Sequence, residues 1–268
     1  MTAKIWKWGP ILALFGVLAA TVVVGDQMLS VAQFRPAYVT GWLLLGMVVM
    51  LALFGVRKQV SFLPVGSAAN WLQLHIFVGL LSGIVYIVHS EARVPTGWPE
   101  LLLAVAYLGT FGSGVLGWGL SRGIPPLLSA RGQEVIFERI PLYIRQLRDE
   151  VEMLVGEANS AENPLTMLYA RELRPFFSRP CHVGWHLLQS QRPRQLLLRR
   201  VDSCRNRLDA DEAERLDRMA DLIFVKDDLD YHYALQGILK LWLFVHLPLT
   251  YGLLVFSILH VLLVHAFG

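Results

Sequence analysis

The last thirty residues of the chain, from Leu239 to Gly268, form an almost unbroken apolar run. About 20 consecutive apolar residues in a helix are enough to cross the roughly 30 Å hydrocarbon core of a bilayer. The run is therefore long enough to span a membrane. It also carries three histidines, His246, His260 and His265, which are costly residues to place in that environment.

Four more apolar blocks precede this run. The chain as a whole is 54% hydrophobic and only 17% charged, which is unusual for a soluble domain. The five blocks are Pro10–Gly25, Tyr38–Val56, Trp71–His89, Leu101–Leu120 and Ile238–Phe267. We therefore expect an all-α membrane protein with five transmembrane helices, four of them in residues 1–120 and the fifth in residues 237–268.

The segment 121–236 has a different character, because it is charged and rich in arginine. It is long enough to form a domain of its own. Its apolar stripes predict helices and no strands. The expected helices are Gln133–Glu157 with a bend at Pro141, Pro164–Phe177 beginning at Pro164, Trp185–Leu188, Gln195–Leu208 and Asp211–Lys226.

The distribution of basic residues predicts the orientation of the chain. Lys4 and Lys7 precede the first apolar block, Arg57 and Lys58 follow the second, and most arginines lie in residues 121–236. The positive-inside rule places these segments in the cytoplasm. With five spans the C-terminus then lies outside, and residues 121–236 form a helical cytoplasmic insert.

Histidines in two of the apolar blocks share one spacing. His75 is followed by His89, and His246 by His260, fourteen positions later in each case. Fourteen helical residues return to within about 40° of the starting face and rise about 21 Å. Each helix would therefore present two imidazoles on one stripe. A lone histidine usually just bonds a neighbouring helix, but the repeated spacing favours a functional site.

The predicted orientation puts these histidines at two depths. Both blocks run from inside to outside, so His75 and His246 lie at one depth and His89 and His260 at the other. Facing helices would then form two pairs of imidazoles, which is the arrangement needed for axial ligation of two haem irons. Zinc would need four ligands in one place, and the sequence has no Cys-x-x-Cys-His motif for covalent haem attachment.

Glycines in the third and fourth blocks allow close approach of a neighbour. Gly79 and Gly83 are four residues apart and share a helix face, where they could admit a flat cofactor or a packed helix. Gly112 begins a G-x-G-x-x-G match, but no strand precedes it, so we reject dinucleotide binding and expect close packing there. Gly79, Gly83 and Gly112 are the candidate cofactor-facing glycines.

Three polar groups outside the paired histidines are open to more than one interpretation. An acidic run before the last block, Asp227, Asp228 and Asp230, suits a helix start better than a metal site. A second group, Cys181, His182 and His186, is more typical of structural residues than of a metal centre. A third group of arginines fits either anionic lipid headgroups or a solvated face; it consists of Arg192, Arg194, Arg199 and Arg200. His265 lies about 140° around from His260, so it is expected near the interface, where it could contact a partner or a quinone.

The paired histidine spans resemble the membrane core of di-haem b-type cytochromes. These include the cytochrome b of quinol oxidoreductases and the membrane domain of ferric reductases. The residues that carry the resemblance are His75, His89, His246 and His260, and it covers less than half of the chain. It implies two non-covalent haems b in a four-helix bundle, ligated by His75/His246 and His89/His260, that carry electrons across the membrane. Arg93, together with Arg57 or Arg122, would be candidate partners for the haem propionates.

The sequence also departs from these families. We find no flavin or nicotinamide domain and no Pro-Glu-Trp-Tyr motif, and the helical insert belongs to neither pattern. The resemblance therefore implies an electron-transfer subunit in a bacterial inner membrane that works with c-type cytochrome or iron–sulfur subunits. A quinone is a further candidate partner, and nucleic acid is not expected. The alternatives are a quinol-oxidising or metal-reducing reductase and a helical anchor with no redox role.

Overall fold

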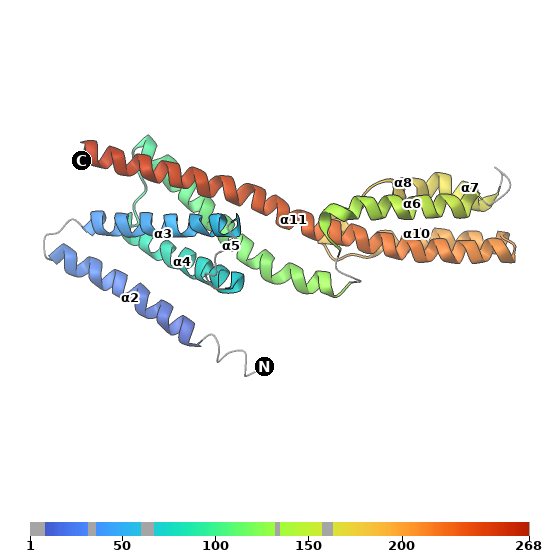
Figure 1. Ribbon diagram of the computed structural model, residues 1–268, viewed down its shortest axis with the longest axis horizontal. Helices are drawn as coiled ribbons and strands as arrows, with labels where there is room; N and C mark the ends of the chain where they lie inside the picture. Colours follow the sequence, from blue (N-terminus) through green and yellow to red (C-terminus); the bar gives the residue numbers. More distant parts are fainter. Residues whose placement is uncertain (1–8, 32–35, 60–66, 132–134, 157–162, 268) are drawn as a thin grey trace. The chain divides into compact units, whose positions relative to one another are not determined.

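The computed structural model describes residues 9–31, 36–59, 67–131, 135–156 and 163–267, and these residues form helices and connections without a strand (Figure 1). The side chains of residues 9–12, 29–31, 36, 56–59 and 207 lie outside the description. The helices are α2 (Gly9–Val31), α3 (Pro36–Gln59), α4 (Ala68–His89), α5 (Trp98–Ser129), α6 (Ile140–Gly156), α7 (Pro164–Leu168), α8 (Arg174–Ser178), α9 (Val183–Leu187), α10 (Arg192–Cys204) and α11 (Ala210–Phe267). The predicted all-α class is confirmed.

The chain divides into two compact units. Unit 1 contains the described residues up to Trp118 and those from Trp242 onward, and unit 2 contains residues 119–241. Helices α5 and α11 contribute residues to both units.

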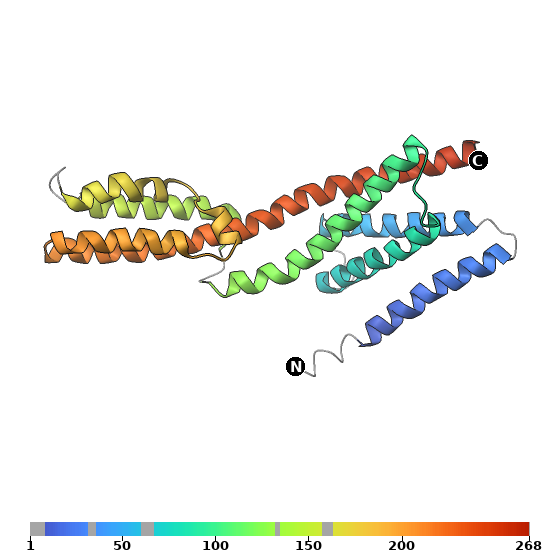
Figure 2. The ribbon, with the colours of Figure 1, turned by 180° about the vertical axis from the view of Figure 1, so that it is seen from behind.

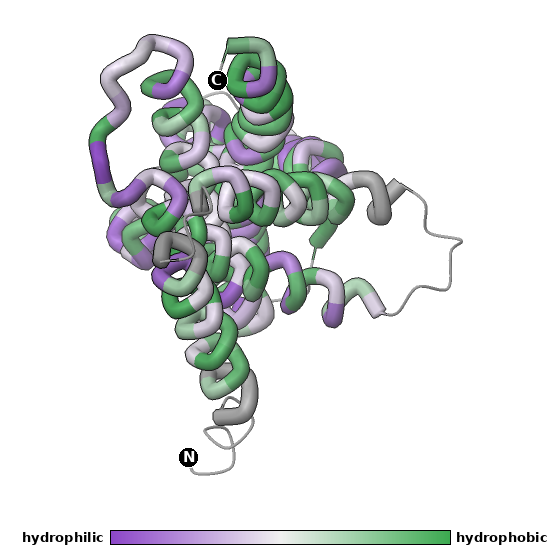
Figure 3. Tube along the Cα trace, turned by 90° about the vertical axis from the view of Figure 1, so that its left-hand side faces the viewer, coloured by the Kyte–Doolittle hydropathy of each residue, from purple (hydrophilic) through white to green (hydrophobic). Residues whose placement is uncertain are grey.

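Unit 1 contains the apolar helices. Among the described residues, α3, α4, α5 and α11 are long and apolar enough to cross a membrane. The apolar part of α2 that is described, Ala13–Met28, is shorter. Many large apolar side chains point outward, as shown by Phe244, Leu262 and Val105, which are 77%, 61% and 61% exposed. The helices that face the viewer in Figure 3 are accordingly mostly hydrophobic, as expected for surfaces that lipid would cover.

The core of unit 1 is the place where four helices meet. Val48 of α3, Tyr107 of α5 and Leu253 of α11 are buried together, and Tyr86 of α4 packs against them. This convergence brings the histidine-bearing helices α4 and α11 to one core, with α3 and α5 beside them.

Unit 2 is a helical bundle around an apolar core. Figure 2 shows α6, α7, α8 and α10 alongside the N-terminal part of α11. Val151 of α6, Phe177 of α8 and Met219 of α11 are fully buried in this core. As predicted, α7 begins at Pro164, where the Asn163 side chain accepts a hydrogen bond of 2.8 Å from the Leu165 amide. The prediction of a helix bent at Pro141 is wrong, because α6 begins at Ile140 and Pro141 lies in its first turn, where its missing N–H costs nothing.

Helix α11 corrects two further expectations. We expected a helix ending at Lys226 and a separate fifth span, but α11 is a single helix of 58 residues. Asp227, Asp228 and Asp230 therefore lie far inside a helix, and the interpretation of this run as a favourable helix start is wrong. Burial and ion-pair partners explain Asp227 and Asp230 instead.

Candidate functional site

Helices α4 and α11 bring four histidines together as two pairs. The imidazoles of His75 and His246 lie close enough to interact electrostatically, and so do those of His89 and His260. Each pair joins one residue of α4 to one residue of α11. The two interactions join the residues that the predicted orientation of the chain places at one depth.

A hydroxyl group on α3 orients His89. Nδ1 of His89 lies 3.2 Å from Oγ1 of Thr40, and the Thr40 hydroxyl itself donates to the Ala37 carbonyl at 3.3 Å. A hydroxyl has one proton to give, so Oγ1 of Thr40 accepts from Nδ1–H of His89. This leaves the lone pair on Nε2 of a neutral imidazole. Gly41 lies against the same ring, because a Cβ at this position would be 3.0 Å from Cε1 of His89.

The same arrangement recurs at His246, with α5 in place of α3. Nδ1 of His246 lies 2.8 Å from Oγ of Ser113, and Ser113 donates to the Thr110 carbonyl at 2.8 Å. Nε2 of His246 therefore also keeps its lone pair. A Cβ at Gly114 would lie 3.6 Å from Cε1 of His246, and the indole of Trp242 stacks on the imidazole with ring centroids 5.3 Å apart.

His75 has an unsatisfied ring nitrogen. Its ring interacts with the backbone of Leu51 and lies 5.0 Å, centroid to centroid, from the ring of Phe54. Nδ1 of His75 is buried, and no described residue offers it a hydrogen bond. A buried polar atom without a partner costs free energy, so this atom is a candidate for contact with a ligand.

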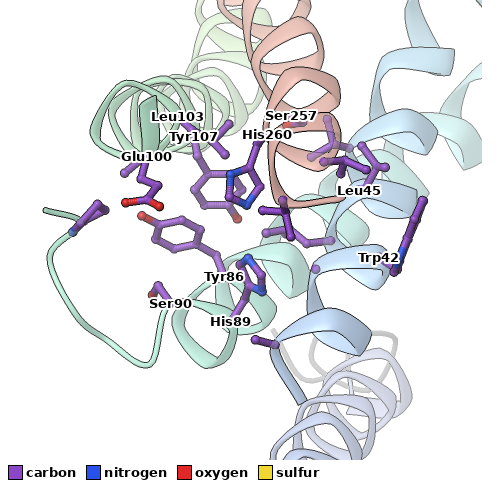
Figure 4. A pocket seen from close by; sticks show the side chains of 18 of the residues that line it. Trp42, Leu45, Tyr86, His89, Ser90, Glu100, Leu103, Tyr107, Ser257 and His260 are labelled. Carbon is purple, nitrogen blue, oxygen red and sulfur yellow. The ribbon is translucent and has the colours of Figure 1, made fainter. Parts of the chain in front are cut away.

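A cavity of about 400 Å³ surrounds the pair His89 and His260. We call it the His89 cavity. Its size is within the range of small-molecule and cofactor sites. In Figure 4 both imidazoles point into it, with Tyr86 beside them and Glu100 near its edge. Its polar lining residues are Tyr38, Trp42, Tyr86, His89, Ser90, Arg93, Glu100, Tyr107, Ser257, His260 and His265.

Stacked aromatic rings form one wall of the His89 cavity. Tyr86 of α4 stacks on Tyr107 of α5 with ring centroids 4.2 Å apart and planes inclined by 14°. The Tyr107 hydroxyl lies 3.0 Å from the buried Ser82 hydroxyl. The hydroxyl of Tyr107 is therefore satisfied within the core, which keeps its ring in place.

The three arginines that were predicted as partners of the haem propionates lie in different places. Arg93 lines the His89 cavity and also pairs with Glu91 at 3.1 Å on the surface. The side chain of Arg57 lies outside the described residues. Arg122 is exposed and belongs to unit 2. Of the three, Arg93 is the arginine that the structure brings to a histidine pair.

The three predicted glycines do not face the imidazoles. A Cβ at Gly83 would lie 2.8 Å from the ring of Phe111, so this position serves close helix packing. Gly79 faces Leu51 at 3.9 Å, and Gly112 has nothing within 4 Å in the described structure. The glycines that do touch the imidazoles, Gly41 and Gly114, were not predicted.

His265 is the remaining histidine of α11. It is exposed, and its ring lies 6.1 Å from that of Tyr38 and 5.9 Å from that of Trp42. Its Nδ1 lies 2.8 Å from the Val261 carbonyl. His265 therefore lies at the edge of the His89 cavity and outside the pairs.

Thr40 and Ser113 are the functional residues that sequence reasoning missed. A hydroxyl inside an apolar span needs a hydrogen-bond partner. The presence of Thr40 and Ser113 in apolar blocks could therefore have indicated polar contacts there. The partner could not be read from the sequence, because it depends on how α3 and α5 are rotated against α4 and α11.

Compared with protein-family models, curated proteins and solved structures, the chain matches none of them. The site is therefore interpreted from its own geometry.

Unit 2 contains a second group of buried polar residues, centred on Asp227. The Asp227 carboxylate is 3% exposed; it accepts a hydrogen bond of 3.1 Å from Arg194 and lies 3.8 Å from Arg131. Nearby, the fully buried Lys226 pairs with Asp230 at 2.5 Å and donates to the Arg179 carbonyl at 3.1 Å. Each carboxylate therefore has at least one cation beside it, which lowers the cost of burying these charges.

His186 lies in the same buried group. Its side chain is 3% exposed, and Nε2 is 3.7 Å from Asp227. Burial, followed by the positive charges of Arg131, His182, Lys226 and Arg194, lowers the pKa of His186 to about 4. The ring is therefore neutral at pH 7. Cys181 and His182 are near neighbours, but no three His, Cys, Asp or Glu side chains among the described residues form a metal-binding cluster.

Proposed function

We propose that this chain transfers electrons across a membrane through two haems b, one held by His75 and His246 and the other by His89 and His260. The observation that carries the proposal is the pairing of α4 and α11 imidazoles at two positions. Bis-histidine ligation requires one imidazole on each face of the haem, and two facing helices supply that.

The surroundings of the imidazoles fit such a group. Nδ1 of His89 and Nδ1 of His246 are each bound to a hydroxyl, which is the outer contact that fixes the ring of a metal-ligating histidine. Nδ1 of His75 is buried without a partner. The His89 cavity supplies space beside the second pair. These features support ligand binding between the paired rings.

The chain's own residues would hold and insulate the group. Thr40 and Ser113 orient His89 and His246, while Gly41 and Gly114 leave room beside those rings. Tyr86, Tyr107 and the apolar core exclude water, and Arg93 can offer a positive charge to a propionate at the cavity. When bound, haem b supplies an iron centre that accepts and releases one electron.

The wider setting belongs to the same proposal. Five spans, a cytoplasmic N-terminus and insert, and an outer C-terminus would place the two haems in series across a bacterial inner membrane. The chain would then act as a cytochrome b subunit between a quinone or cytoplasmic pool and c-type or iron–sulfur partners. The four apolar helices support the membrane location.

The polar lining of the His89 cavity favours a second candidate. Glu100 and Tyr86 line the same space as His89 and His260, so this cavity offers groups that exchange protons. A quinol-oxidising or metal-reducing membrane reductase would need such a pocket. Steady quinol oxidation by the isolated chain would favour this candidate over a subunit that works only within a complex.

An optical spectrum tests the primary proposal. The full chain, purified in mild detergent from a haem-replete host, should show a reducible b-type spectrum, and haem extraction should give two haems per chain. A folded but colourless preparation would contradict the proposal and favour a helical anchor with no redox role.

A further inference from the structure

Unit 2 contains a cavity that the electron-transfer proposal does not use. Its volume is about 590 Å³, and we call it the arginine cavity. Its lining comes from residues 172–185, which include parts of α8 and α9, and from α10. Its lining residues are Glu172, Pro175, Phe176, Arg179, Cys181, His182, Trp185, Arg192, Pro193, Leu196, Leu197 and Arg200.

The lining of this cavity carries an excess of positive charge. Arg179, Arg192 and Arg200 line it together with a single carboxylate, Glu172, which forms an ion pair with Arg200. Within the described structure, the side chains of Arg179 and Arg192 have no ion-pair partner. Two lining arginines that are not paired with a carboxylate are suited to an anion, and arginine binds phosphate through paired N–H donors.

Contacts with a buried lysine fix two of the residues that line the cavity. The buried Lys226 donates to the backbone carbonyl of Arg179 at 3.1 Å and lies 4.3 Å from the ring centre of Phe176. The neighbouring Arg194 is bound to Asp227 and Gln191 and does not line the cavity. The arginine group seen in the sequence is thus divided: Arg194 belongs to the buried charges, Arg192 and Arg200 to the cavity, and Arg199 to the open surface of α10.

Exposed apolar side chains surround the charged lining. Trp185 and Leu196 line the cavity and are 44% and 57% exposed. Leu188, close to Trp185 in the sequence, is 77% exposed. Tryptophan and leucine beside arginine are typical of surfaces that lie at a membrane interface. A small soluble anion would leave these apolar side chains in water, whereas a lipid would cover them.

From these observations we propose that the arginine cavity binds the phosphate of an anionic phospholipid headgroup. Arg179 and Arg192 donate to the phosphate oxygens, while Trp185 and Leu196 contact the apolar part of the lipid. The apolar helices of unit 1 make lipid a constant neighbour of the chain. This inference needs no haem, so it stands or falls independently of the proposed function.

The test uses the full chain in nanodiscs of zwitterionic lipid. Short-chain phosphatidylglycerol, short-chain phosphatidylcholine and inorganic phosphate are added in separate titrations. Hydrogen exchange of the amides in residues 183–191 reports binding at the cavity. These residues lie outside the apolar spans, so lipid around the spans does not contribute to the signal. We expect phosphatidylglycerol to slow this exchange at concentrations at least roughly fivefold below those of phosphatidylcholine. Inorganic phosphate should protect only at far higher concentrations.

Substitutions identify the donors. Arg179→Gln and Arg192→Gln should each weaken the effect of phosphatidylglycerol roughly fivefold, because each basic side chain near an anionic lipid has about that effect. Arg199→Gln is the matched control, since Arg199 is exposed on the same helix outside the cavity, and it should change nothing. Unchanged exchange in the core segment 165–177 will show that each variant is folded.

Three results would overturn the inference. Equal protection by phosphatidylcholine would mean that the contact is purely apolar. Equal protection by inorganic phosphate would mean that the ligand is a free anion. Unaltered binding in folded Arg179→Gln and Arg192→Gln variants would remove the arginines from the site.

Discussion

The two units use the polar groups of their interiors in different ways. In unit 1 these groups include half-buried imidazoles held by the hydroxyls of Thr40 and Ser113, each with a ring nitrogen left over. In unit 2 most of them are charges, with Asp227 between Arg131 and Arg194 and Lys226 beside Asp230, and the neutral ring of His186 lies among them.

This difference indicates that the polar groups of unit 1 serve ligand binding, whereas those of unit 2 serve the stability of the fold. A buried charge is stabilised by an opposite charge close to it, and the ion pairs of Asp227 link α10 and α11, with His186 of α9 beside them. A neutral imidazole with one nitrogen bound keeps the other for a ligand. We therefore expect changes in unit 1 to affect cofactor content, and changes in unit 2 to affect stability.

The largest expected effect is the loss of a cofactor from unit 1. His75→Ala should remove one haem and His89→Ala the other, because each removes one axial ligand. Haem extraction and the optical spectrum measure the loss. His265→Ala is the control and should keep both haems. Two haems retained in His75→Ala or in His89→Ala would refute the pairing.

Breaking the charge group should destabilise unit 2 and leave the cofactor in place. Asp227→Asn leaves Arg131 and Arg194 without their anion, which should cost about 3 kcal/mol. Hydrogen exchange of the unit 2 core in the full chain measures this cost. Asp221→Asn, an exposed change on the same helix, should have no comparable effect. A loss of haem in folded Asp227→Asn would contradict the division of roles.

The stability of unit 2 should depend on pH through the titration of His186. The pKa of His186 is about 4 in the folded chain, against 6.5 ordinarily, so the unfolded chain takes up a proton first as pH falls. The contribution of His186 to stability should be complete above about pH 6.5 and should decline toward pH 4 by up to about 3 kcal/mol. The groups that set this are Asp227, Arg131, Arg194, Lys226 and His182.

Hydrogen exchange of the amides in the unit 2 core, followed from pH 7 to pH 4.5, measures how steeply stability changes with pH. His186→Phe removes the titrating group and should flatten this dependence. An unchanged slope in this variant would assign the acid sensitivity to other residues.

The smallest expected effect comes from the hydroxyls. Ser113→Ala and Thr40→Val should weaken haem binding by about 10- to 100-fold, since they remove the contacts that orient His246 and His89. Ser113→Thr and Thr40→Ser keep a hydroxyl and should largely restore binding. Haem titration of the apo chain distinguishes these cases, and equal affinities in all four variants would show that the hydroxyls do not orient the ligands.

The same contrast explains what the sequence could and could not predict. The apolar blocks predict helices that could cross a membrane, because length and hydropathy decide that outcome. The spacing from His75 to His89 and from His246 to His260 predicts a shared face, since helix geometry is fixed. Both features depend only on residues within one helix.

Contacts between helices were beyond this reasoning. The glycines chosen by spacing were Gly79, Gly83 and Gly112, whereas Gly41 and Gly114 touch the imidazoles. The acidic residues before Tyr231 were expected at a helix start, but Asp227 finds its partners in the distant Arg131 and Arg194. In each case the outcome depends on how one helix is rotated against another.

The hydroxyl partners and the imidazole pairs have a consequence for biosynthesis. The surroundings of His89 combine α3, α4 and α11, and those of His246 combine α4, α5 and α11. Helix α11 is the last of these to leave the ribosome. Neither pair of imidazoles exists until it has been made, so a nascent chain that stalls before residue 246 has no complete pair to offer.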